Sequence, residues 1–76
     1  MNDQAIAQQG HIRLTARERD VLELLARGLR QEQIAGHLGI GSETVRSHVH
    51  NAAARLGAAN STQAVAIAIR RGLIQS

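Results

Sequence analysis

Four glycines divide most of this 76-residue chain into short segments with helical character: Gly28, Gly39, Gly57 and Gly72. In each preceding segment, apolar residues recur three and four positions apart, which is the spacing of one face of a helix. Many helices end at a residue in the left-handed conformation, and that residue is usually glycine. The glycines therefore predict four helices, each ending at one of them.

The absence of aromatic residues favours the same architecture. The chain also has no proline and no cysteine, so its core must consist of leucine, isoleucine, valine and alanine. Such a core suits packed helices better than a sheet rich in aromatic side chains. A chain of this length forms one small domain, and without cysteine neither disulfides nor a thiolate zinc site can stabilise it. We therefore expect a small all-α, four-helix domain.

Capping signals locate the helix ends. Thr15 is followed three residues later by Glu18, and Asn60 by Gln63, both at the spacing of a helix N-cap. The expected helices cover residues 16–27, a stretch between Gly28 and Gly39, a stretch between Gly41 and Gly57, and residues 61–71. Gly36 lies inside the second helix at a cost of roughly 1 kcal/mol relative to alanine. We therefore expect Gly36 to pack closely against a neighbouring element.

The remaining segment precedes the first helix. Residues 1–12 are rich in glutamine and weakly patterned, so we expect a mobile tail or linker stub before a domain at residues 13–76. No apolar run approaches the ~20 residues of a membrane span, and no stretch resembles a signal peptide. We expect a soluble, cytoplasmic protein. Its expected core residues are Leu14, Val21, Leu22, Leu25, Ile34, Leu38, Ile40, Val45, Val49, Leu56, Val65 and Ile69.

The segment between Gly39 and Gly57 has two distinct faces. At 100° per residue, its valines, one leucine and two alanines fall in one stripe, whereas Arg46, Ser47 and His50 lie away from that stripe. About three residues around Gly39 join this helix to the preceding one, which is the turn length of a helix-turn-helix. The second helix of such a motif enters the major groove of DNA, where its N-terminal half meets the base edges.

Arg46, Ser47 and His50 lie on that N-terminal half. Arg46 can donate two hydrogen bonds to guanine O6 and N7, while Ser47 and His50 can contact bases or phosphates. Nine arginines against six acids give a net charge of +3, which favours anionic partners. A polar outer face alone is usually only solvated surface. The combination of the short turn, the two-faced helix and the basic balance favours binding of double-stranded DNA.

A longer series of residues lies at the fixed spacing of a known family: Leu14, Thr15, Arg17, Glu18, Val21, Leu22, Gly28, Ile34, Ala35, Leu38, Gly39, Ile40, Thr44, Val45, His48, Leu56, Gly57, Ala64, Val65, Ala68, Gly72, Leu73 and Ile74. In these residues the chain resembles the LuxR/GerE/NarL-type DNA-binding domains. The resemblance implies a bacterial transcription regulator with four helices, in which the second and third form the helix-turn-helix. Most such regulators carry a further domain upstream, so the chain is either a stand-alone member or an excised output domain.

The resemblance also implies specific contacts with DNA. Contacts to bases fall at Arg46, Ser47 and His50, the same residues that helical geometry selects. Contacts to phosphates are expected at the start of the second helix and along the third: Gln31, Ser42, Thr44, Asn51 and Arg55. Glu32 stands where the family often has lysine. This acid favours an alternative, a protein-interaction module that dimerises with a full-length regulator without reading DNA.

The last helix contains the sequence AVAIAI, which is apolar on every side. Val65 and Ile69, with two alanines, are sufficient to cover the core, which leaves Ala66 and Ile67 outward. We expect a second copy of the chain to cover them, as a weak or DNA-dependent homodimer on an inverted-repeat site. The alternative is that one exposed isoleucine has no partner. The expected interface residues are Ala64, Ile67, Ala68 and Arg71.

No pattern indicates catalysis, a cofactor or a metal site. His48 and His50 are two residues apart on a helix and do not face each other, and no thiol or carboxylate cluster completes a ligand set. No nucleophile, base and orienting acid occur at a suggestive spacing. We expect a non-enzymatic protein in which His48 is partly buried.

Overall fold

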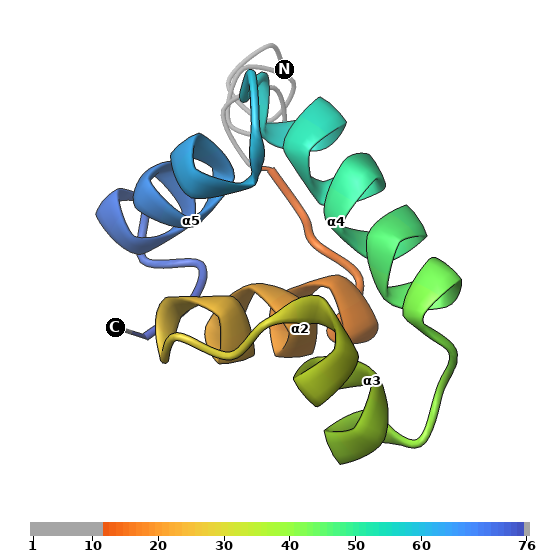
Figure 1. Ribbon diagram of the computed structural model, residues 1–76. Coiled ribbons are helices and arrows are strands. Elements are labelled where there is room, and N and C mark those ends of the chain that lie inside the picture. The colour runs from red at the N-terminus through yellow and green to blue at the C-terminus, as the bar shows by residue number, and fades with distance from the viewer. Residues whose placement is uncertain (1–11, 76) are drawn as a thin grey trace, which may run out of the picture.

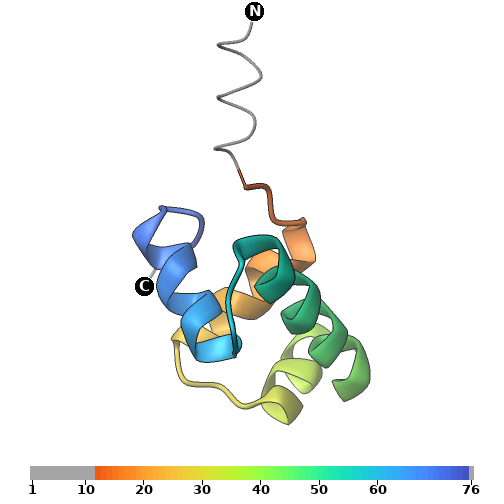
Figure 2. The same ribbon diagram turned by 90° about the horizontal axis from the view of Figure 1, so that it is seen from above.

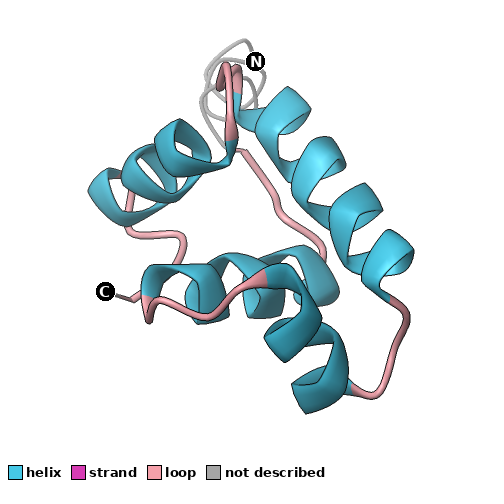
Figure 3. Ribbon diagram, in the orientation of Figure 1, coloured by secondary structure: helices cyan, strands magenta, loops and turns pink. Residues whose placement is uncertain are grey.

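The computed structural model describes residues 12–75 and contains four helices in this part of the chain. They are α2 (Ala16–Ala26), α3 (Gln31–Leu38), α4 (Ser42–Leu56) and α5 (Ser61–Arg70), shown in Figure 1. Residues 12–75 include no strand (Figure 3), so the prediction of an all-α domain is confirmed. Helices α2 and α5 each end one residue before the expected position. Of the expected tail, residues 1–11 lie outside the described residues.

The predicted caps are present at the helix starts. At α2, the Thr15 hydroxyl accepts from the Glu18 backbone N–H at 3.0 Å, and the Glu18 carboxylate accepts from the Thr15 N–H at 3.0 Å. At α5, the Asn60 side chain accepts from the Gln63 backbone N–H at 2.8 Å. These bonds satisfy N–H groups that have no partner within the helix. The sequence signals for both helix starts are therefore confirmed.

The glycines lie at the helix ends, as predicted, and all four have a positive φ. Gly39 and Gly57, with φ of 70° and 67°, are the C-caps of α3 and α4. After α5, the backbone N–H of Leu73 bonds back to the Ala68 carbonyl at 2.8 Å. This turn directs the chain back toward the core, where Ile74 is buried.

Helix α2 contacts the other three helices (Figures 1 and 2), and it contributes to two core clusters. The first cluster lies between α2, α3 and α4 and consists of Val21, Leu24, Ile34, Ala35, Val45 and Val49. The second lies between α2, α4 and α5 and consists of Leu22, Ala52, Leu56, Ala64, Ala68 and Ile74. Leu25 is partly buried and packs against both. The two clusters fix α4 between α3 and α5.

Three expectations about packing are wrong. Ile69 was expected in the core but is 36% exposed, because α5 turns Ala64 and Ala68 toward the second cluster instead. Leu24 was not expected in the core, yet it is buried in the first cluster. Gly36 is exposed, and a Cβ at its position would have no atom within 4 Å, so it makes no close contact. None of the described helices combines the length and apolar character needed to cross a bilayer.

Candidate nucleic-acid interface

Residues 39–41 connect α3 to α4 in a tight turn. Gly39 ends α3 in the left-handed conformation, and the N–H of Ile40 bonds back to the Ala35 carbonyl at 3.1 Å. Ile34 of α3 and Val45 of α4 are both fully buried in the first cluster. The short turn and this shared packing hold the two helices as one unit, the arrangement of a helix-turn-helix.

The buried side of α4 determines which side chains face outward. Val45, Val49, Ala52 and Leu56 are buried at intervals of three and four residues, so they form one continuous stripe. Arg46, Ser47 and His50 are all exposed. Because positions three and four apart are neighbours on a helix surface, these three residues form a single outer patch. This patch, Arg46, Ser47 and His50, is hereafter the outer patch of α4.

The residues predicted to contact phosphates are spread along two helices. Ser42 and Thr44 are exposed in the first turn of α4, whose N-cap residue, Gly41, provides no side-chain hydrogen bond. Asn51 is exposed further along α4. Gln31 starts α3 and is partly buried. The structure therefore brings the α4 residues together on one helix and leaves Gln31 on the other.

Arg55, the fifth predicted phosphate contact, is held by an acid. Its Nε lies 3.1 Å from Oε1 of Glu18 and 3.3 Å from Oε2, with a hydrogen bond to Oε2. Glu18 is only 2% exposed. The sequence predicted Glu18 as part of a cap but not its pairing with Arg55. The available signal was its position three and four residues before Val21 and Leu22, which places the carboxylate on the buried face of α2.

The predicted interface residues of α5 lie mainly inside the domain. Ala64 and Ala68 are fully buried, and Ile67 is partly buried against the second cluster. Arg71 is exposed directly after the helix. The exposed large apolar residue in the described part of the chain is Ile69. The outward apolar position of α5 is therefore Ile69 rather than Ile67.

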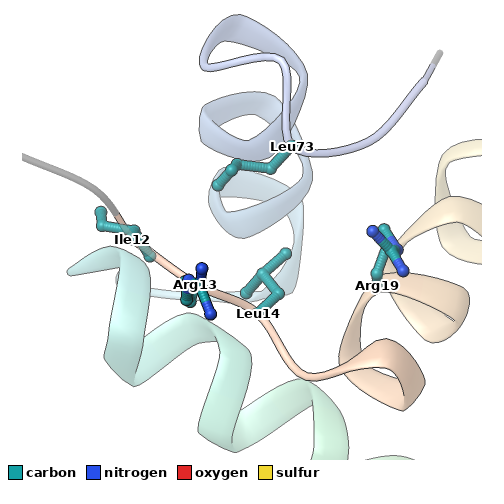
Figure 4. A pocket seen from close by; sticks show the side chains of 5 residues that line it. All are labelled: Ile12, Arg13, Leu14, Arg19 and Leu73. Carbon is teal, nitrogen blue, oxygen red and sulfur yellow. The ribbon is translucent and has the colours of Figure 1, made fainter.

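A hollow of about 390 Å³ lies between the segment that precedes α2 and the turn that follows α5, and Figure 4 shows the side chains around it. It is lined by Ile12, Arg13, Leu14, Arg19 and Leu73. This set consists of two arginines and three apolar side chains, with neither a carboxylate nor a nucleophile, so the hollow offers no acid–base pair. Residues 12–75 also contain no group of three or more histidines and acids placed to hold a metal ion.

Comparisons with known proteins agree with this geometry. A family model described as bacterial regulatory proteins, luxR family, matches residues 13–68. The spore germination protein GerE of Bacillus subtilis is 42% identical over 62 residues, which are 82% of this chain and 84% of that protein. The uncharacterized transcriptional regulatory protein YxjL of Bacillus subtilis is 46% identical over 61 residues, which are 80% of this chain but 28% of that protein.

Solved structures show the same fold. The structure of the transcription factor GerE is similar with a TM-score of 0.78 at 35% identity, covering 82% of this chain and 92% of that chain. A Vibrio cholerae VqmA dimer, described as a LuxR-type receptor, is similar with a TM-score of 0.80 at 30% identity. The match covers 97% of this chain and 38% of that chain. The chain thus spans less than half the length of YxjL and VqmA.

Proposed function

Because the chain belongs to the luxR family of bacterial regulatory proteins, we propose that it binds double-stranded DNA to regulate transcription, with α4 in the major groove. The observation that carries the proposal is the outer patch of α4. Its three side chains are exposed outside the buried stripe, so the helix can enter a groove without losing contacts in the core. We propose the cytoplasm as its location, because a bacterial regulator meets chromosomal DNA there.

Each residue of the outer patch has a defined role in this proposal. Arg46 donates two hydrogen bonds to guanine O6 and N7, a pairing that no other base offers in the major groove. Ser47 and His50 contact neighbouring base edges or sugar-phosphate oxygens. Phosphate contacts position the helix without reading sequence, and we assign them to Ser42, Thr44, Asn51, Arg55 and Gln31. The uncapped first turn of α4 supports a phosphate near Ser42, since helix N-termini favour anions.

We further propose a weak homodimer through the outer side of α5. Ile69 and Ala66 are exposed there, and Arg71 is exposed directly after the helix. Ile69 and Ala66 replace Ala64 and Ala68 in the expected interface. Ile67 contributes only its exposed part. A symmetric pair would place two copies of α4 about 34 Å apart, one turn of DNA, which matches an inverted repeat.

The test starts from duplexes selected out of a random pool by the wild-type chain. Arg46→Ala is expected to lose roughly 1–3 kcal/mol of binding free energy on the selected duplex and less on unrelated duplexes. Arg17→Ala is the matched control, because Arg17 is an exposed arginine of α2 paired with Asp20 at 3.7 Å. Equal losses for both variants on every duplex would contradict base reading by Arg46.

A second candidate function is an interaction module that pairs with a full-length regulator without reading DNA. The observation in its favour is Glu32, an exposed acid in the first turn of α3, where it would repel a phosphate. Sedimentation of the chain alone and with duplex separates the two functions. If the chain dimerises but binds no duplex at low salt, the interaction module replaces DNA binding as the proposed function.

A further inference from the structure

Glu18 is the buried charged residue of the described chain, and its carboxylate has two partners. Oε1 accepts the Thr15 backbone N–H at 3.0 Å, and both oxygens lie within 3.3 Å of Nε of Arg55. The Glu18 backbone N–H in turn donates to the Thr15 hydroxyl at 3.0 Å. These bonds fix the carboxylate at the first turn of α2, so it cannot follow a moving arginine.

Arg55 lies on the other side of this ion pair, 37 residues away in sequence on the C-terminal half of α4. Its side chain is 49% exposed, whereas the side chain of Glu18 is 3% exposed. An arginine has five N–H donors in a rigid plane, and the hydrogen bond to Glu18 uses the one on Nε. A guanidinium held in this way has a fixed plane, while half of the side chain still faces solvent.

We propose that Glu18 is a positioning residue for DNA binding, which holds Nε of Arg55 so that the guanidinium meets a backbone phosphate in one orientation. The inference rests on the proposed function, in which Arg55 contacts phosphate. A flexible arginine must lose side-chain entropy when it binds, whereas an arginine already held by a fixed carboxylate has lost most of that freedom in the free protein. The acid thus contributes to the binding of a polyanion.

This proposal and a simple count of charges predict opposite signs. Removing an acid makes the chain more basic, and electrostatics alone then predicts tighter binding to DNA. Positioning predicts weaker binding, because Arg55 becomes mobile. Glu18→Gln separates the two predictions, since glutamine retains an oxygen that can accept the Thr15 N–H and so preserves the cap.

The matched control is Asp20→Asn. Asp20 lies on the same helix and pairs with Arg17 at 3.7 Å, with both side chains exposed, and its substitution changes the net charge by the same amount. Duplex affinity is measured by fluorescence anisotropy at several salt concentrations and at a temperature where circular dichroism shows every variant folded. We expect Glu18→Gln to bind about three- to tenfold more weakly, and Asp20→Asn to bind as tightly as wild type or more tightly.

A second pair of variants tests whether Glu18 acts through Arg55. Arg55→Ala is expected to weaken binding and to reduce the salt slope by about 0.9, the value for one phosphate contact. In the Arg55→Ala background, Glu18→Gln should cause no further loss. Arg55→Lys keeps the charge but has no Nε donor, so it should retain the salt slope while losing affinity. The ordered Nε–H signal of Arg55 in nuclear magnetic resonance spectra should broaden or shift in Glu18→Gln.

Three outcomes would overturn the inference. The first is unchanged or tighter binding by folded Glu18→Gln, which would make the ion pair purely structural. The second is that Glu18→Gln lowers duplex affinity as much in the Arg55→Ala background as in wild type, which would mean that Glu18 acts on the fold. The third is a wild-type chain that binds no duplex, which would also end the proposed function. If Arg46→Ala weakens binding while Glu18→Gln does not, only the positioning role fails.

Discussion

The two core clusters are built from side chains of different size. The first, between α2, α3 and α4, contains a single alanine among larger aliphatic residues. The second, between α2, α4 and α5, contains three alanines, Ala52, Ala64 and Ala68, and all three are fully buried. Small side chains let two helices approach closely but bury little apolar surface. On average, each buried residue of the first cluster therefore removes more apolar surface from water than one of the second, whereas more partly buried side chains pack against the second cluster.

Helix α4 contributes to both clusters, and its two halves are held by different side chains. Val45 and Val49 pack in the first cluster, beside the turns that carry the outer patch of α4. Ala52 and Leu56 pack in the second, where the ion pair between Arg55 and Glu18 adds a polar tie to α2. Two valines thus fix the end of α4 proposed to read bases, while an alanine, a leucine and a charge pair hold the other end.

The largest expected effect is in the first cluster. Ile34→Ala removes most of a side chain that is fully buried between α3 and α4, and we expect it to lower the free energy of unfolding by about 2–5 kcal/mol. Urea denaturation followed by circular dichroism measures the change. Ile69→Ala is the matched control, because the same side chain is exposed there; we expect it to cost less than about 1 kcal/mol. If both variants lost the same free energy of unfolding, isoleucine burial would not differ between the first cluster and the outer side of α5.

An intermediate effect is expected on α5, where two isoleucines two residues apart differ in burial. Ile67→Glu places a charge against the second cluster and should destabilise the fold by about 1–3 kcal/mol. Ile69→Glu should change stability by less than about 0.5 kcal/mol and yet abolish cooperative binding to a duplex with two half-sites. Thermal unfolding and binding isotherms on one and two half-sites distinguish these outcomes. Cooperative loading that survives Ile69→Glu would exclude this side of α5 as the dimer contact.

The sequence predicted the helices because their ends depend on local signals. The Thr15–Glu18 cap and the glycine C-caps Gly39 and Gly57 act within a few residues of a helix end, so no tertiary information is needed to recognise them. The exposure of Arg46 was predictable for a similar reason. Helix α4 has apolar residues on one side and polar residues on the other, and that contrast determines which side is buried.

Other features depend on packing that the sequence does not encode locally. The stretch AVAIAI of α5 is apolar on every side, so periodicity could not decide whether Ile67 or Ile69 faces inward. The ion pair of Glu18 with Arg55 joins residues 37 positions apart, and no local pattern identifies the partner of a buried acid. The contacts of Gly36 depended on neighbours in space, and the structure shows none.

The smallest expected effect is a gain in stability from Gly36→Ala. Gly36 lies inside α3, it is exposed, and a Cβ there would have no atom within 4 Å. Alanine is therefore expected to raise the free energy of unfolding by roughly 0.5–1 kcal/mol, because glycine loses more backbone entropy in a helix. Gly39→Ala is the contrasting variant, since its φ of 70° strains an alanine by about 1–2 kcal/mol. Urea midpoints should move in opposite directions. If Gly36→Ala instead lowers the midpoint, α3 packs more tightly than the structure shows, and the first cluster extends to its outer side.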